Sequence, residues 1–250
     1  MTIKRPKSSK DRIVLALDVD TLEEVEQIVK ELKDYVGFFK VGLQLIASTG
    51  FDSIDIIKNN GGKVFLDSKF HDIPNTVAKA SVNLLRKGVD FFNLHIQGGS
   101  KMISSTVKLT REYAKKNNIE QPTILGVTLL SSFGQKTLTE ELNVNLNIDD
   151  YVANLTKIAI NSGINGVVAS SIEAKEIRKT LDDDFIIMCP AVRPTWSCVN
   201  DQIRVLTPKA AINYGVDYLI VGRPIICAEN RIVAANLIID EIEEACSVEI

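Results

Sequence analysis

The feature that most constrains the fold of this chain is the alternation of short apolar runs with segments of helical periodicity. The apolar run 13–17 comes first, and after it Leu22, Val25, Ile28 and Leu32 recur at the spacing of one helix face. Strands that alternate with helices in this way form parallel sheets. Further apolar runs follow at 38–41, 64–66, 91–95, 123–129, 166–169, 185–189 and 218–221.

Strand–helix units repeated in this number, with right-handed crossovers, close into a barrel. The 250 residues fit one such domain. We therefore predict an α/β fold, a single (β/α)8 (TIM) barrel over residues 13–250, preceded by a basic N-terminal tail at 1–12. The helices are expected at 22–35, 43–60, 73–87, 100–116, 149–161, 172–181, 208–214 and 224–246.

Two long connections join predicted elements: the polar segment 131–147 and the irregular segment 190–206. An irregular run as long as the second favours a lid over a scaffold element in a compact barrel, and the first is another candidate for a mobile loop. Trp196, in the second connection, could equally be a packed anchor for its loop.

Composition limits the partners that can be expected. Lys and Arg number 29 against 32 Asp and Glu, a net charge of −3, which gives no indication of a nucleic-acid partner. The basic cluster before the first strand is expected to be a solvated tail. No apolar run approaches the ~18–20 residues needed to cross a bilayer, and no signal peptide is recognised, so we expect a cytoplasmic protein with no membrane partner. Scattered cysteines and two histidines make a zinc site improbable.

Charged residues gather where the third apolar run ends, in the stretch KVFLDSKFHDIPNTV that begins at Lys63. Side chains alternate along a strand, so Asp67 and Lys69 should project from the same side. Asp72 should lie beyond the strand, just before a helix that begins near Pro74. Charges at the end of a buried strand cost free energy unless they are paired or used.

Two interpretations of this stretch are open: an ion pair that closes the end of the sheet, or part of an active site. The order Asp-x-Lys-x-x-Asp favours the second. A lysine between two carboxylates stays protonated, and a cation held rigidly at a barrel mouth can stabilise a carbanion and then protonate it. Other unusual residues also fall at predicted strand ends, where barrels place their chemistry: Asp18, Lys40 and Gly222.

The last strand is followed by Gly222-Arg223-Pro224. Gly222 allows a ligand to approach the backbone, Arg223 offers a guanidinium fork, and Pro224 suits the first turn of a helix. Arg193, on the preceding loop, supplies a second cation. Either arginine alone could form a surface ion pair, but two on adjacent loops of a barrel favour a phosphate site.

These residues and motifs resemble the orotidine 5′-phosphate decarboxylase family, from Ile13 to the last predicted helix. The matching segments are Leu15-Ala16-Leu17-Asp18, Phe39-Lys40-Val41-Gly42, Asp67 to Thr76, Pro190 to Arg193, Asn200-Asp201-Gln202 and Val221-Gly222-Arg223. One departure is visible: the family usually has Thr-Pro-Gly where this chain has Cys189-Pro190-Ala191. Because alanine avoids positive φ, the loop must take a different path or tolerate strain.

The resemblance implies an activity and a set of roles. The activity is conversion of orotidine 5′-phosphate (OMP) to UMP and CO2, a step of de novo pyrimidine biosynthesis, by a homodimer that needs no cofactor and no metal. Lys69 would protonate C6 of the pyrimidine within an array that also contains Lys40, Asp67 and Asp72. The implied substrate contacts are Asp18 and Lys40 for the ribose, Ser131 for the pyrimidine, Arg193, Gln202, Gly222 and Arg223 for the phosphate, and Thr76, with Asp72, reaching the partner subunit's site.

Two alternatives remain. Sugar-phosphate decarboxylases or aldolases of the same barrel group share Asp-x-Lys-x-x-Asp but use Mg²⁺, held partly by a glutamate where strand two ends. This chain has Lys40 there, which would repel a divalent cation. The second alternative is a barrel that binds a nucleotide as a sensor and has no catalytic activity. Loss of Lys69 or Asp72 would mark such a protein, and this chain has both residues.

Overall fold

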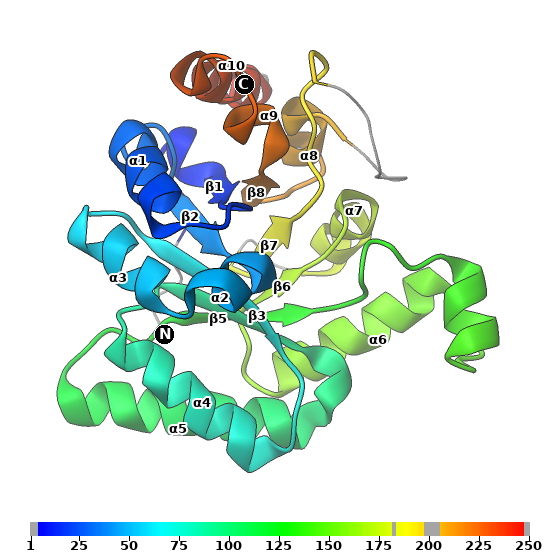
Figure 1. The fold of residues 1–250 in the computed structure, drawn as a ribbon. Coiled ribbons are helices and arrows are strands. Elements are labelled where there is room, and N and C mark those ends of the chain that lie inside the picture. Colours follow the sequence, from blue (N-terminus) through cyan, green and yellow to red (C-terminus); the bar gives the residue numbers. More distant parts are fainter. Residues whose placement is uncertain (1–4, 182–183, 198–205, 248–250) are drawn as a thin grey trace.

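The computed structural model describes residues 5–181, 184–197 and 206–247, and it is a closed barrel of parallel strands (Figure 1). Each strand pairs with the next in sequence, and β8 pairs with β1, for example Val14 with Ile220. This confirms the predicted (β/α)8 fold. The strands are β1 (Ile13–Ala16), β2 (Phe38–Val41), β3 (Val64–Phe70), β4 (Phe91–His95), β5 (Thr123–Val127), β6 (Gly166–Val168), β7 (Ile186–Cys189) and β8 (Tyr218–Val221).

Helices cover the outside of the barrel, and α4 and α5 lie side by side along one flank (Figure 1). They begin where the sequence offers capping groups: Thr21 accepts a hydrogen bond from Glu24 N at the start of α1, and Asn147 accepts one from Asp150 N at the start of α6. The α-helices are α1 (Leu22–Leu32), α2 (Leu43–Thr49), α3 (Asp52–Asn59), α4 (Pro74–Arg86), α5 (Gly99–Asn117), α6 (Ile148–Asn161), α7 (Ser171–Thr180), α8 (Pro208–Asn213), α9 (Arg223–Ile226) and α10 (Arg231–Cys246), with 3-10 turns η1 (Lys10–Arg12) and η2 (Ile96–Gly98) and a π-helical turn η3 (Thr137–Glu141).

Two predictions of helices were wrong. The single helix expected at 43–60 is two helices, because Gly50 takes a φ of +64° that no α-helix accommodates. The helix expected from 224 is interrupted after Ile226, and α10 begins anew with Asn230 as its cap, accepting from Val233 N. The polar connection 131–147 contains the short turn η3.

The inside of the barrel is filled from its amino-terminal end by aromatic rings. Phe38, Phe91 and Tyr218 are each the first residue of their strand, and their ring centroids lie 4.7 to 5.6 Å apart in edge-on geometry. Edge-on contacts of this kind are favourable beyond the area they bury. The three rings are almost fully buried, so they form a plug that closes the barrel opposite the carboxyl ends of the strands.

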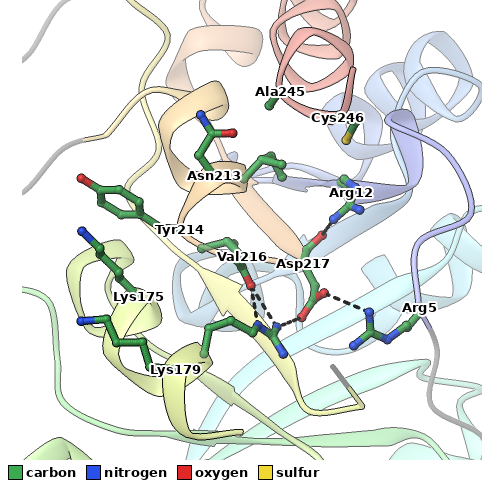
Figure 2. Close-up of a pocket in the computed structure, with 13 residues that line it drawn as sticks. Arg5, Arg12, Lys175, Lys179, Asn213, Tyr214, Val216, Asp217, Ala245 and Cys246 are labelled. Carbon is green, nitrogen blue, oxygen red and sulfur yellow. Dashed lines mark hydrogen bonds and ion pairs between the residues drawn. The ribbon is translucent and has the colours of Figure 1, made fainter. Parts of the chain in front are cut away.

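Below this plug, two arginines of the N-terminal segment contact the residue before β8, while Arg5, Lys7 and Lys10 remain exposed. Arg12 donates to the backbone oxygen of Asp217 at 3.3 Å, and Arg5 lies 4.0 Å from the Asp217 carboxylate (Figure 2). These residues line a pocket of about 530 Å³ before β8. Among the residues described, no helix is long and apolar enough to cross a membrane.

Candidate active site

The carboxyl ends of β1, β2 and β3 bring four predicted site residues into one cluster. Lys69 Nζ lies 2.6 Å from Asp67 Oδ1, and Lys40 Nζ lies 3.6 Å from Asp67 Oδ2. Lys40 Nζ also lies 3.4 Å from Asp18 Oδ1. The alternating charges that the sequence suggested are therefore contiguous in space, and each carboxylate oxygen of Asp67 faces a different ammonium group.

Asp67 is the centre of this cluster, and its side chain is only 13% exposed. Burial opposes its ionisation, but the Lys40 and Lys69 ammonium groups, with hydrogen bonds from Lys69 and Asn93, lower the pKa of Asp67 below its usual value. Asp67 is thus a carboxylate at neutral pH. The site therefore holds a buried negative charge between two positive ones.

The sequence analysis missed Asn93, although it contacts this cluster directly. Asn93 lies in β4, is fully buried, and its side-chain amide donates to Asp67 Oδ1 at 2.7 Å. In the sequence it is one polar residue in an apolar strand, flanked by Phe92 and Leu94. A buried, uncharged polar residue near a strand end was the only signal available.

His95, at the end of β4, lies beside the same mouth with its ring 5.5 Å from that of His71. Burial, followed by the charges of His71 and Lys69, lowers the pKa of His95. Its Nδ1 is buried and has no hydrogen-bond partner among the residues described. His95 is accordingly a neutral imidazole at physiological pH.

Asp72 and Thr76 do not join the cluster within their own chain. Asp72 is exposed and accepts a hydrogen bond from Ile73 N at 2.6 Å, and no described residue forms an ion pair with it. Thr76 is exposed on the first turn of α4, and Ile73 beside it is 67% exposed. The second aspartate of Asp-x-Lys-x-x-Asp is therefore an exposed residue between β3 and α4, and the ion pair that Lys69 forms among the described residues is with Asp67.

The two arginines predicted for a phosphate site do come together. Arg193 and Arg223 line one pocket of about 290 Å³, together with Trp196. Trp196 is 44% exposed, so it is not a packed anchor. Gly222 lies next to the charged cluster, because a Cβ placed on it would be 3.4 Å from Asp18 Oδ2. The pocket and the cluster are thus neighbours at the mouth of the barrel.

Three further predictions concern the loops at this mouth. Ser131 is exposed in the turn that follows β5. Ala191 takes a φ of +66°, so the loop after β7 tolerates backbone strain at the position where a glycine was expected. Gln202 lies outside the residues that the structure describes, as does Asn200.

Fold and site together define a (β/α)8-barrel enzyme, with its charged side chains at the carboxyl ends of the strands. The family model described as orotidine 5′-phosphate decarboxylase / HUMPS family matches residues 11–238, and the chain belongs to that family.

Named relatives and solved structures agree. The orotidine 5′-phosphate decarboxylase of Heliobacterium modesticaldum is 42% identical over 94% of this chain and 97% of its own length. That of Carboxydothermus hydrogenoformans is 45% identical over 93% of this chain and 96% of its own. The crystal structure of the Lactobacillus acidophilus orotidine 5′-phosphate decarboxylase superposes with a TM-score of 0.81 at 34% identity, covering 96% of this chain and 99% of that one.

Proposed function

We propose that this enzyme decarboxylates orotidine 5′-phosphate to UMP and CO2, in de novo pyrimidine biosynthesis. The observation that carries the proposal is the contiguous array of Lys40, Asp67 and Lys69 at the barrel mouth. The two named relatives, which this chain matches over 96–97% of their lengths, are orotidine 5′-phosphate decarboxylases.

In the proposed reaction the bond between C6 and the carboxylate carbon breaks, CO2 leaves, and the electron pair stays on C6. The Lys69 ammonium then donates a proton to C6, and the lysine amine regains a proton from solvent. No carbonyl conjugates directly with the charge at C6, so placed charges must stabilise it. Electrostatic stabilisation of this kind usually contributes more to catalysis than any other single effect.

The geometry of Asp67 supports this division of labour. Asp67 is ionised and buried, so a substrate carboxylate placed against it is repelled, and that repulsion is relieved when CO2 departs. The contact with Asp67 Oδ1 would hold the Lys69 ammonium beside the substrate carboxylate as well. Proton donor and leaving group would thus meet at one carbon atom.

Contacts remote from C6 would supply binding energy for closing the site and orienting the ring. Arg193 and Arg223, which share a pocket, would clamp the phosphate with Gly222 and Gln202. Asp18 and Lys40, 3.4 Å apart, would bind the ribose hydroxyls, and Ser131 would contact the pyrimidine.

We further propose that the active unit is a homodimer, in which Asp72 and Thr76 enter the site of the partner subunit. The exposure of both residues, and the separation of Asp72 from the cluster of its own chain, support this arrangement. A second carboxylate from the partner would complete the alternating array. The proposal includes no metal, because the Lys40 ammonium adjoins Asp67 and Asp18, where it would repel a divalent cation.

The test is the loss of absorbance of the orotate chromophore when purified protein meets orotidine 5′-phosphate, with a chelator present. We expect turnover that Lys69→Ala abolishes and that Lys30→Ala, a change at an exposed lysine of α1, leaves intact. Activity that disappears on chelation and returns with Mg²⁺ would favour a metal-dependent sugar-phosphate enzyme. Absence of turnover with and without Mg²⁺ would overturn the proposal.

A further inference from the structure

We propose that Asn93 is a positioning residue for this chemistry: it holds the segment Asp67–Lys69 so that the Asp67 carboxylate and the Lys69 ammonium both face the reacting carbon. This inference rests on the proposed decarboxylase function and adds a residue to it. Asn93 is called positioning because it acts through Asp67 and Lys69.

Asn93 binds each residue of that segment. Its Nδ2 donates to Asp67 Oδ1 at 2.7 Å, its Oδ1 accepts from Lys69 N at 2.6 Å, and its backbone oxygen accepts from Ser68 Oγ at 2.9 Å. The side chain is fully buried. A buried amide with both its donor and its acceptor engaged is fixed in one orientation.

The pairing of β3 with β4 explains why such a residue is needed. Leu66 pairs with Phe92 and Phe70 pairs with Leu94, so the three residues of the segment lie opposite the single residue Asn93. This is a bulge, and the extra residues of a bulge lose their ladder hydrogen bonds. Asn93 replaces those bonds with its side chain, which keeps the bulge from leaving buried polar groups unsatisfied.

The bulge includes a strained residue. Lys69 has a backbone φ of +45°, which residues other than glycine, asparagine and aspartate rarely adopt. The hydrogen bond from Lys69 N to Asn93 Oδ1 lies at that residue. Without it, the backbone at Lys69 is free to relax towards an extended conformation, and the ammonium group would be re-aimed.

The donor of Asn93 has a separate effect on Asp67. It shares Asp67 Oδ1 with the Lys69 ammonium, which leaves Oδ2 turned towards Lys40. Other titratable groups near this cluster are His95 at the end of β4, His71 after β3, and Asp18, which lies just beyond β1 and faces Lys40. Unlike these groups, Asn93 carries no charge at any pH, and its hydrogen bond to Oδ1 fixes the rotation of the Asp67 carboxylate.

Asn93→Asp separates these effects. It keeps the size of the side chain and an acceptor for Lys69 N, but it places a second carboxylate against Asp67. Two carboxylates in contact share a proton, and the apparent pKa of the pair is raised. Asn93→Ala removes both hydrogen bonds. The matched control is Thr106→Val, which removes a fully buried hydroxyl of α5 that donates to Met102 O and forms no hydrogen bond with Asp67, Lys69 or Asn93.

The experiment measures kcat, KM, the pH dependence of kcat, the Kd for UMP and the thermal midpoint of each variant, after wild-type turnover has been established. For Asn93→Ala we expect kcat to fall about 100-fold, because displacement of catalytic groups by about 1 Å costs that much, with KM and the Kd for UMP nearly unchanged. For Asn93→Asp we expect kcat to fall at acidic pH and its acid limb to move to higher pH, because the protonated pair no longer provides the charged Asp67.

Thr106→Val should lower the thermal midpoint without changing kcat or its pH profile. The inference is overturned if the Asn93 variants behave like Thr106→Val, losing stability alone. If Asn93→Ala does not fold, the isosteric Asn93→Asp decides the question by its pH profile. Wild-type protein that does not turn over would instead refute the proposed function itself.

Discussion

Lys69 and Ala191 both hold a backbone conformation that their side chains disfavour, and both lie at the mouth of the barrel. Their φ values are +45° and +66°. Asn118 and Asn143 also have positive φ, but asparagine tolerates this region. Strain at functional positions persists only when the surroundings enforce it. Lys69 is held by its hydrogen bonds with Asn93 and Asp67. Ala191 lies in the short loop between the end of β7 and Arg193.

Ala191→Gly should therefore stabilise the protein. Glycine removes a conformational strain of about 1–2 kcal/mol, but the greater entropy of the unfolded chain costs about 0.5–1 kcal/mol, so we expect a net gain of up to about 1.5 kcal/mol in the free energy of unfolding. The measurement is urea denaturation. Ala174→Gly, in the buried face of α7, is the control and should destabilise. A loss of stability in Ala191→Gly would show that the loop is not strained.

Arg223→Ala should weaken nucleotide binding through the phosphate. Arg223 and Arg193 share one pocket, and removing one partner of a desolvated charge pair costs roughly 2–5 kcal/mol. Calorimetric titration with UMP and with uridine separates the contributions: the loss should appear for UMP and be small for uridine. Arg231→Ala removes an arginine that pairs with Glu31 on the outside of the barrel and serves as the control. Equal affinity for UMP in wild type and Arg223→Ala would exclude the phosphate role.

At the scale of elements, the ends of α7, β7 and β8 are joined by Arg178. It donates to Asp217 Oδ2 at 2.8 Å, to Gly215 O at 2.9 Å and to Phe185 O at 2.9 Å. Asp217 in turn accepts from Ile187 N at 2.8 Å, and lies among the arginines of the N-terminal segment (Figure 2). Burial raises the pKa of Asp217, an effect that the Ile187 amide and Arg178 oppose. Arg178 thus compensates the buried negative charge of Asp217 and links α7 to the segments that precede β7 and β8.

Arg178→Leu should destabilise the fold by about 3–5 kcal/mol, because it leaves the carboxylate of Asp217 buried without its closest cation. Lys179→Leu, the neighbouring change at an exposed lysine paired with Glu176, should alter stability by less than about 1 kcal/mol. Urea denaturation of both variants compares them directly. Protein that remains folded should keep its activity, since Arg178 lies at the opposite end of the barrel from Asp67. Equal stability of the two variants would contradict this account.

The elements that the sequence predicted well are those whose signal is local. The strands at 38–41 and 91–95 have the bounds that their apolar runs indicated. The break at Gly50 was missed because the apolar period continues across it, and glycine inside a helix is possible on sequence alone. The cluster of Asp18, Lys40, Asp67 and Lys69 followed from the rule that barrels place chemistry at strand ends. Asn93 could not be found in this way, because its role depends on the register between two strands, which no local pattern specifies.

At the scale of the whole molecule, a single chain presents only part of the proposed site. Asp72 is exposed and forms no ion pair with a described residue, and the apolar side chains of Ile73 and Leu43, which follow β3 and β2, are 67% and 61% exposed. Exposed apolar side chains around an incomplete polar site are what a subunit interface would cover. In a dimer in which each subunit places Asp72 in the site of its partner, every site would contain Asp67 from one chain and Asp72 from the other.

Complementation tests this exchange. Lys69→Ala and Asp72→Ala, each expected to be inactive alone, are mixed under conditions that allow subunits to exchange. A mixed dimer then has one site with both lesions and one with neither, so up to about half of the wild-type activity per heterodimer should return. No return of activity, with heterodimers demonstrated by mass, would mean that Asp72 serves the site of its own chain.

The aromatic plug of Phe38, Phe91 and Tyr218 has a consequence for traffic through the proposed enzyme. With the barrel sealed at one end, nucleotide, carbon dioxide and the proton that recharges Lys69 all share a single portal. Carbon dioxide must then pass the nucleotide that still fills the entrance, and the lysine cannot be recharged from behind. Substrate entry, product release and reprotonation of Lys69 would therefore compete for the same opening in the proposed enzyme.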